Sequence, residues 1–174
     1  MDITCETGPH YLVFCDEDLK DSGAFKMNPP IRSKKDREAL IEGICDGTID
    51  MIATDHAPHS KEEKSGGLKE SLMGIVGFET AFGALYTHLV QKGIITLERL
   101  IELMSINPAK RFGIENGLEV GKKANLCVLD TKAQYMVKPH TFLSKGKCTP
   151  FEGMCLSGEN TLSFANGKIV WRKK

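Results

Sequence analysis

The most constraining feature of the sequence is an apolar strand pattern that ends abruptly in polar groups. The stretch "IDMIAT", residues 49–54, is apolar at nearly every position, as is typical of strands covered on both faces. Asp55, His56 and His59 follow it directly. Functional groups gather at strand ends in parallel α/β folds, so we predict that Asp55 binds a metal ion or acts as a general base. An aspartate in this position is equally typical of a helix cap or an Asx-turn.

A second, shorter strand pattern precedes this one. It is "DITCE", residues 2–6, and it also ends in a carboxylate, Glu6. Between the two strands the sequence predicts a helix, with Ser33 as its N-cap, Asp36 in its first turn and Gly47 at its end. The order strand, helix, strand indicates parallel βα units. Two parallel strands cannot close a barrel, so the chain has the pattern of the end of a larger α/β fold.

The middle of the chain is a polar connection followed by helices. Residues 61–72 are charged and Gly-rich; a long connection of this kind is often a mobile flap, although a solvated surface run is the simpler interpretation. Residues 78–89 have the apolar spacing of an amphipathic helix. Thr96 is placed to cap the next helix, and Asn107 is predicted to cap a separate, miniature one.

The last third of the sequence has a β pattern. Residues 125–130, "NLCVLD", predict a strand, and the Asn166-Gly167 pair predicts a tight hairpin turn near the end. We therefore divide the chain into an α/β part, residues 1–116, and a β part, residues 117–174.

Composition excludes several classes of function. The chain has 23 basic and 23 acidic residues, which argues against a nucleic-acid or membrane partner bound by bulk charge. No signal peptide is expected from its first residues, and its apolar runs are too short to span a bilayer. Its six cysteines contain no C-x-x-C pair, so we expect reduced thiols and a cytoplasmic location. A metal pair of Cys148 and Cys155 is the alternative for two of them.

Several stretches, taken in order, resemble bacterial dihydroorotases, which belong to the amidohydrolase superfamily. They include "CETGPHYL", "KMNPPIRS", "DREALIEGICDGTIDMIATDHAPHS", "GIVGFETAFGALYTHLV" and "EVGKKANLCVLD", and the resemblance covers essentially the whole chain. It implies the C-terminal portion of a (β/α)8 metal-dependent hydrolase barrel, followed by part of a small accessory β domain. The family's H-x-H metal pair and most of its other ligands would lie upstream of this chain.

The resemblance also implies roles for individual residues. Asp55 matches the aspartate at the end of the eighth barrel strand, which makes it both the catalytic residue and a zinc ligand. Asn28 and His59 match substrate-binding residues, with His59 contacting the substrate carboxylate. Met73 and Gly74 lie where the backbone contacts the dihydropyrimidine ring.

Two histidines near these positions have no assigned role. His56 lies inside the "TDHAPHS" motif, but the resemblance gives it no function. His10 stands in "GPHY", where many relatives have "TPHH", which makes it a weak candidate. Asn125 replaces a more usual aspartate, with an expected structural consequence only.

The activity implied is the zinc-dependent, reversible cyclisation of N-carbamoyl-L-aspartate to L-dihydroorotate in pyrimidine biosynthesis. Because most metal ligands lie upstream, we expect the chain alone to be inactive and to need the N-terminal half of the barrel as a partner. A homodimer and a complex with aspartate transcarbamoylase are further expected partners. Two alternatives stay open: a non-catalytic dihydroorotase-like subunit that scaffolds aspartate transcarbamoylase, and a related cyclic amidase of the allantoinase or hydantoinase kind.

Overall fold

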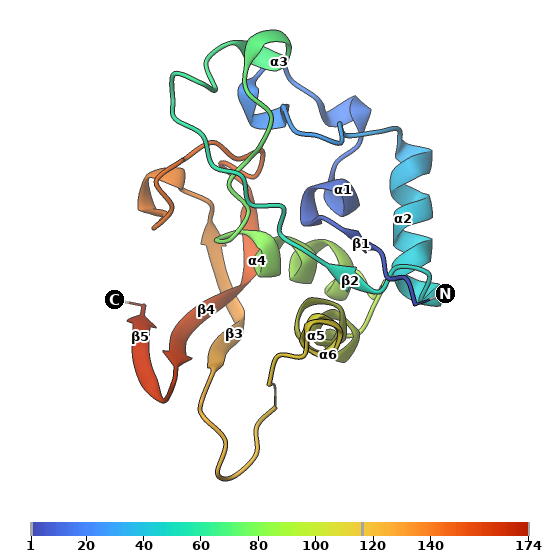
Figure 1. The fold of residues 1–174 in the computed structure, drawn as a ribbon. Helices are drawn as coiled ribbons and strands as arrows, with labels where there is room; N and C mark the ends of the chain where they lie inside the picture. The colour runs from blue at the N-terminus through green and yellow to red at the C-terminus, as the bar shows by residue number, and fades with distance from the viewer. Residues whose placement is uncertain (1, 116, 174) are drawn as a thin grey trace.

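The computed structural model describes residues 2–115 and 117–173, and it has the α/β character that the sequence predicts (Figure 1). Two short strands pair in parallel near the middle of the molecule, and three longer strands form a separate antiparallel sheet in the order β3-β4-β5. The strands are β1 (Glu6–Thr7), β2 (Met51–Ile52), β3 (Leu126–Met136), β4 (Cys155–Ala165) and β5 (Lys168–Arg172).

Helical segments connect and cover these strands. The α-helices are α1 (Pro9–Val13), α2 (Lys34–Asp46), α3 (Gly67–Glu70), α4 (Ala81–Leu85), α5 (Leu97–Ile101) and α6 (Asn107–Phe112). Two π-helical stretches, η3 (Tyr86–Val90) and η4 (Glu102–Ile106), continue α4 and α5 without a break. Three single turns of 3-10 helix are η1 (Asp16–Asp18), η2 (Gly23–Phe25) and η5 (Pro139–Thr141). In the described residues no helix is long and apolar enough to cross a membrane.

The helix between the two parallel strands, α2, begins and ends where the sequence predicts. The Ser33 hydroxyl accepts a hydrogen bond from the Asp36 amide at 3.3 Å, and the Asp36 carboxylate accepts one from the Ser33 amide at 3.0 Å. This reciprocal pair is a capping box, which satisfies two amides that the first helical turn leaves free. Gly47 ends the helix in the left-handed region, with φ of 89°, where a side chain would be strained.

The parallel pairing of the first two strands is also confirmed, but the second strand is shorter than predicted. Glu6 pairs with Met51. The Asp50 amide donates a hydrogen bond to the Cys5 carbonyl (3.1 Å), and the Ala53 amide donates one to the Thr7 carbonyl (3.0 Å), so the ladder extends on both sides of the pair. Strand geometry ends before Asp55, because its φ of 49° takes the backbone out of the extended region. Both strands therefore end at the same edge, where the candidate site begins.

The prediction of a separate helix capped by Asn107 is wrong. Asn107 has helical backbone angles, φ −64° and ψ −46°, and η4 leads directly into α6. Its side-chain amide instead donates a hydrogen bond to the carbonyl of Asp50 at 2.8 Å, which ties this helix to the start of β2. Pro108 removes one helical N–H, and the wider π turn of η4 just before it accommodates that loss. The cap at Thr96 is as predicted, and Gly113 ends α6 in the left-handed region.

The antiparallel sheet confirms the predicted hairpin. Asn166 and Gly167, with φ of 50° and 79°, form the turn between β4 and β5, as expected for a two-residue hairpin loop that requires positive φ at both positions. The sheet lies to one side of the helices, and the C-terminus ends beside it (Figure 1).

Two buried clusters of apolar side chains hold these parts together. One lies under α2, α4 and α5 and comprises Leu12, Ile44, Ile49, Ile52, Leu85, Leu89, Ile95, Leu100 and Leu103. The other comprises Val13, Phe14, Phe25, Met27, Ile31, Ile75, Ala84, Val137, Phe151 and Leu156. The second cluster joins residues from both sides of position 116, so the two predicted parts share a core. The division into domains at residue 116 stays a prediction.

Candidate functional site

Asp55 lies three residues beyond β2, at the edge where both parallel strands end. Its side chain is about half exposed (46%). Together with Glu6, Tyr11 and Arg32 it lines a cavity of about 370 Å³. The structure thus places the carboxylate of Asp55 where it can reach a ligand in the cavity, and it brings Glu6, the second strand-end carboxylate, to the same wall.

His10 is the nearest ionisable neighbour of Asp55. It lies on α1, just after β1, and is only 1% exposed. Its Nε2 atom is 3.6 Å from a carboxylate oxygen of Asp55, beyond hydrogen-bond distance, and has no hydrogen-bond partner among the described residues. Burial lowers the pKa of His10 to about 4, so the ring is neutral near pH 7. His10, a weak candidate in the sequence, is thus a buried neutral imidazole facing the site.

Tyr11 is a site residue that the sequence did not point to. Its hydroxyl donates a hydrogen bond to the carbonyl of Pro29 at 2.8 Å, so α1 is tied to the segment that carries Asn28. Burial, and then the charge of Asp55, raise the pKa of Tyr11 and keep its hydroxyl protonated. The only signal in the sequence was its departure from the "TPHH" pattern, where a histidine stands at this position.

His56 is next to Asp55 in sequence but belongs to a different environment. Its ring stacks on Phe78, with centroids 3.9 Å apart and planes inclined by 7°. Its Nδ1 atom accepts hydrogen bonds from the amides of Gly77 (3.2 Å) and Phe78 (3.4 Å). It lines a second cavity of about 800 Å³, between α4 and the antiparallel sheet, which does not include Asp55. These contacts give His56 a structural role, because they fix the segment that leads into α4.

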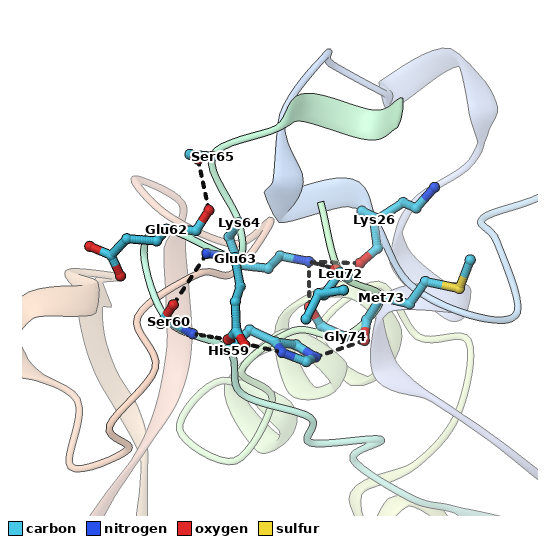
Figure 2. A network of polar contacts seen from close by, with 10 residues as sticks. All are labelled: Lys26, His59, Ser60, Glu62, Glu63, Lys64, Ser65, Leu72, Met73 and Gly74. Carbon is cyan, nitrogen blue, oxygen red and sulfur yellow. Dashed lines mark hydrogen bonds and ion pairs between the residues drawn. The ribbon is translucent and has the colours of Figure 1, made fainter. Parts of the chain in front are cut away.

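His59, Met73 and Gly74, three of the four predicted substrate-binding residues, lie together (Figure 2). The Nε2 atom of His59 is 3.0 Å from the Met73 carbonyl, which can only accept, so Nε2 carries a hydrogen. The Nδ1 atom of His59 is 3.3 Å from the carboxylate of Glu63. Both ring nitrogens of His59 therefore have partners within the chain, and a ligand carboxylate would have to share or replace one of them.

Gly74 is a position where a side chain would not fit. Its φ of 138° is strained for other residues, and an added Cβ would lie 2.5 Å from the carbonyl oxygen of Ala57. Its amide donates a hydrogen bond to the carbonyl of Lys26 at 3.0 Å. This bond holds residues 72–74 against the segment of Asn28, the fourth predicted substrate-binding residue, whose side chain is exposed.

The charged run of residues 61–72 is not uniformly solvated, contrary to the simpler interpretation of its sequence. Lys64 is 6% exposed, and its ammonium group donates hydrogen bonds to the carbonyls of Lys26, Leu72 and Gly74. Sequence reasoning missed this residue, because nothing in the run distinguishes it from its charged neighbours. Whether the exposed part of the run moves as a flap stays a prediction.

Possible metal ligands among the described residues are scattered and not clustered. Within residues 2–115 and 117–173 there is no group of three or more His, Cys, Asp or Glu side chains that could hold a metal ion. Asp55, half exposed on its cavity, fits the role of one carboxylate ligand. The six cysteines are unpaired, and Cys148 and Cys155 form no such group. Further ligands would have to come from outside this chain.

Known proteins similar in sequence to this chain include members of the amidohydrolase family and proteins named dihydroorotase. The sequence of residues 13–170 matches the profile of the amidohydrolase family. A protein named dihydroorotase from Anoxybacillus flavithermus is 54% identical over 98% of this chain, and one from Bacillus cytotoxicus is 52% identical over 99% of it. The chain spans only 40% and 41% of the length of these two relatives.

Solved structures agree on the fold. The L-hydantoinase (dihydropyrimidinase) of Arthrobacter aurescens superimposes with a TM-score of 0.91 at 37% identity, covering 99% of this chain and 40% of that protein. A dihydropyrimidinase from Brevibacillus agri superimposes with a TM-score of 0.88 at 25% identity, again covering 40% of its own chain. The expected α/β architecture, part of a metal-dependent hydrolase barrel, is confirmed, and the chain belongs to the amidohydrolase family.

Proposed function

We propose that this chain is the C-terminal part of a dihydroorotase. The complete enzyme would interconvert N-carbamoyl-L-aspartate and L-dihydroorotate in pyrimidine biosynthesis. The observation that carries the proposal is the position of Asp55, which leaves β2 in a left-handed conformation and opens on a cavity beside a buried neutral histidine. Identity of 54% to a protein named dihydroorotase, over nearly the whole chain, supports this choice among the cyclic amidases.

In the hydrolytic direction, Asp55 would act as the general base and then as the acid. Its carboxylate takes a proton from the attacking water as the water oxygen bonds to the ring amide carbon. It then returns the proton to the ring nitrogen as the C–N bond breaks, which gives N-carbamoyl-L-aspartate. Half exposure suits this role, because the carboxylate can reach both the water and the leaving nitrogen. The neutral ring of His10 beside it adds no positive charge that would weaken the base.

Asp55 would also hold zinc, with the other ligands supplied from outside this chain. Bound zinc supplies a water of lowered pKa and polarises the amide carbonyl.

Substrate recognition would fall to the cluster around His59. The substrate is an anion, and the chain has no net charge, so recognition needs local donors. The candidates for its carboxylate are the ring of His59, which would have to share a nitrogen with Met73 or Glu63, and the side chain of Asn28. The backbone at Met73 and Gly74, which hydrogen bonds fix to His59 and to Lys26, is the candidate for its ring.

A hydantoinase-like activity is the second candidate, because solved hydantoinases superimpose closely on this chain. The two functions differ in their substrates. Dihydroorotate carries a ring carboxylate that dihydrouracil lacks, and a site that pairs a buried carboxylate discriminates strongly against the analogue without it.

The test is an assay of the complete enzyme, made by replacing the matching residues of the A. flavithermus dihydroorotase with this chain. We expect hydrolysis of dihydroorotate with a kcat/KM at least a hundredfold above that for dihydrouracil or hydantoin. A preference for dihydrouracil or hydantoin would refute the proposal in favour of the hydantoinase-like activity. The unmodified relative serves as the control for assembly and metal content.

A further inference from the structure

Lys64 is a buried lysine that the proposed mechanism leaves unused. Its Nζ atom lies 3.0 Å from the carbonyl oxygen of Lys26, 2.6 Å from that of Leu72 and 2.7 Å from that of Gly74 (Figure 2). An ammonium group has three N–H donors and no acceptor. The three carbonyls therefore account for its full hydrogen-bonding capacity.

These carbonyls belong to residues that flank the proposed substrate-binding positions. Leu72 and Gly74 lie on either side of Met73, and Lys26 precedes Asn28 by two residues. The carbonyl between the two bound ones, that of Met73, accepts the hydrogen bond of His59 at 3.0 Å. With its neighbours held by Lys64, the Met73 carbonyl is kept available to orient the ring of His59.

The turn that carries Lys64 is itself fixed to the same network. The Glu63 carboxylate accepts a hydrogen bond from the Ser60 amide at 2.8 Å and contacts His59 at 3.3 Å. The Glu63 carbonyl accepts one from the Leu72 amide at 3.0 Å. Residues 59–64 and 72–74 are thus joined by backbone and side-chain bonds, and Lys64 connects both to the segment at Lys26, directly after η2.

Stability alone is a poor explanation for a lysine in this place. Burying an ammonium carries a desolvation penalty, and apolar residues of similar volume often serve stability as well or better. Burial, together with the neighbouring charge of Lys26, lowers the pKa of Lys64, yet only the protonated form has donors for all three carbonyls. The ammonium group fixes the direction of three backbone carbonyls through hydrogen bonds, and an apolar side chain cannot do this.

We propose that Lys64 is a positioning residue that holds the backbone of residues 72–74 and the segment of Asn28 in the geometry that recognises the substrate. It does not touch the substrate and takes no part in proton transfer. This inference rests on the proposed function. It states that one buried side chain keeps the substrate-binding surface, formed by residues 72–74 and the segment of Asn28, in its working geometry.

The test compares two variants of the complete enzyme with a matched control. Lys64→Met keeps the length of the side chain and removes all three donors. Lys64→Arg keeps the charge but offers a planar donor group that cannot reproduce three converging bonds. Lys61→Met removes an exposed lysine of the same turn, and so controls for the loss of charge.

We expect Lys64→Met to raise KM for dihydroorotate about tenfold and to change kcat by less, because a displaced binding surface affects ground and transition states alike. Lys64→Arg should raise KM in the same direction, and Lys61→Met should leave both constants within about twofold. If Lys64→Met does not fold, Lys64→Arg decides. A folded variant at Lys64 with the parent KM, or with kcat reduced and KM unchanged, would overturn the inference.

Failure of the proposed function would look different. The parent enzyme would then prefer dihydrouracil or hydantoin, and the same KM comparison on the preferred substrate would still test Lys64. Amide exchange adds a measurement that needs no turnover. The amides of residues 72–76 should exchange at least tenfold faster in Lys64→Met than in Lys61→Met, because the carbonyls that Lys64 holds become free to move. Equal exchange in the two variants would also overturn the inference.

Discussion

Replacing Asp55 by asparagine in the complete enzyme separates the proposed chemical role of this residue from its structural one. Asp55 has a φ of 49°, in the left-handed region that asparagine tolerates nearly as well as aspartate. Its side chain is half exposed, so the loss of its charge should change stability little. We expect the melting temperature of Asp55→Asn to stay within about 2 °C of the parent.

The kinetic effect should be large in comparison. The amide of asparagine cannot accept the proton of the attacking water, and it is a weaker metal ligand than a carboxylate. The loss of a general base typically lowers kcat by about a hundredfold or more, which corresponds to about 2.7 kcal/mol of transition-state stabilisation. KM should change much less, because the change removes an interaction made in the transition state.

Asp55→Ala provides the matched control for the backbone. Alanine in the left-handed region costs about 1 kcal/mol, so this variant should lose both activity and stability, whereas Asp55→Asn should lose activity alone. The assays are steady-state hydrolysis of dihydroorotate at saturating zinc and thermal unfolding followed by circular dichroism. A kcat of Asp55→Asn within threefold of the parent would remove Asp55 from the chemistry. A loss of stability equal to that of Asp55→Ala would refute the argument from φ.

Four other predictions have definite expected outcomes. The 174-residue chain alone should neither hold one zinc ion per chain nor hydrolyse dihydroorotate; metal analysis showing stoichiometric zinc together with turnover would contradict the ligand argument. His59→Ala and Asn28→Ala should each raise KM for dihydroorotate, lower kcat less than Asp55→Asn does, and weaken the preference over dihydrouracil. An unchanged preference in folded variants would disprove the anchoring role. Ser33→Ala should lower the free energy of unfolding by about 1 kcal/mol in a urea titration, because the capping box is lost. Amide exchange in residues 61–72 should slow when dihydroorotate binds, and equal protection with and without it would identify the run as a plain surface loop.

The sequence by itself determined the local elements whose causes are local. Ser33 and Asp36 cap α2 within one turn, and Asn166-Gly167 forms a hairpin because its backbone preference needs no distant partner. The pattern of residues 49–54 correctly indicated a buried parallel strand shortly before Asp55. Its length was overestimated, because the left-handed conformation at Asp55 has no signature in the apolar pattern.

Tertiary structure decided which polar residues meet. The sequence made His10, forty-five residues before Asp55, only a weak candidate, yet its ring lies 3.6 Å from the Asp55 carboxylate. His56 and Asp55 are adjacent in sequence, yet they line different cavities, because the chain turns sharply between them. Asn107 could not be recognised as a tie to Asp50, because its expected role as a cap assumed that the helix before it ended.

The burial of Lys64 could not be predicted from the sequence around it. In "SKEEK" it is one charge among several, and the local pattern is that of a solvated turn. It is buried because the carbonyl of residue 26, far away in the chain, and those of residues 72 and 74 are directed to one point. Periodicity and capping report on neighbours within a few residues, whereas the environment of this ammonium depends on three segments that only the folded chain brings together.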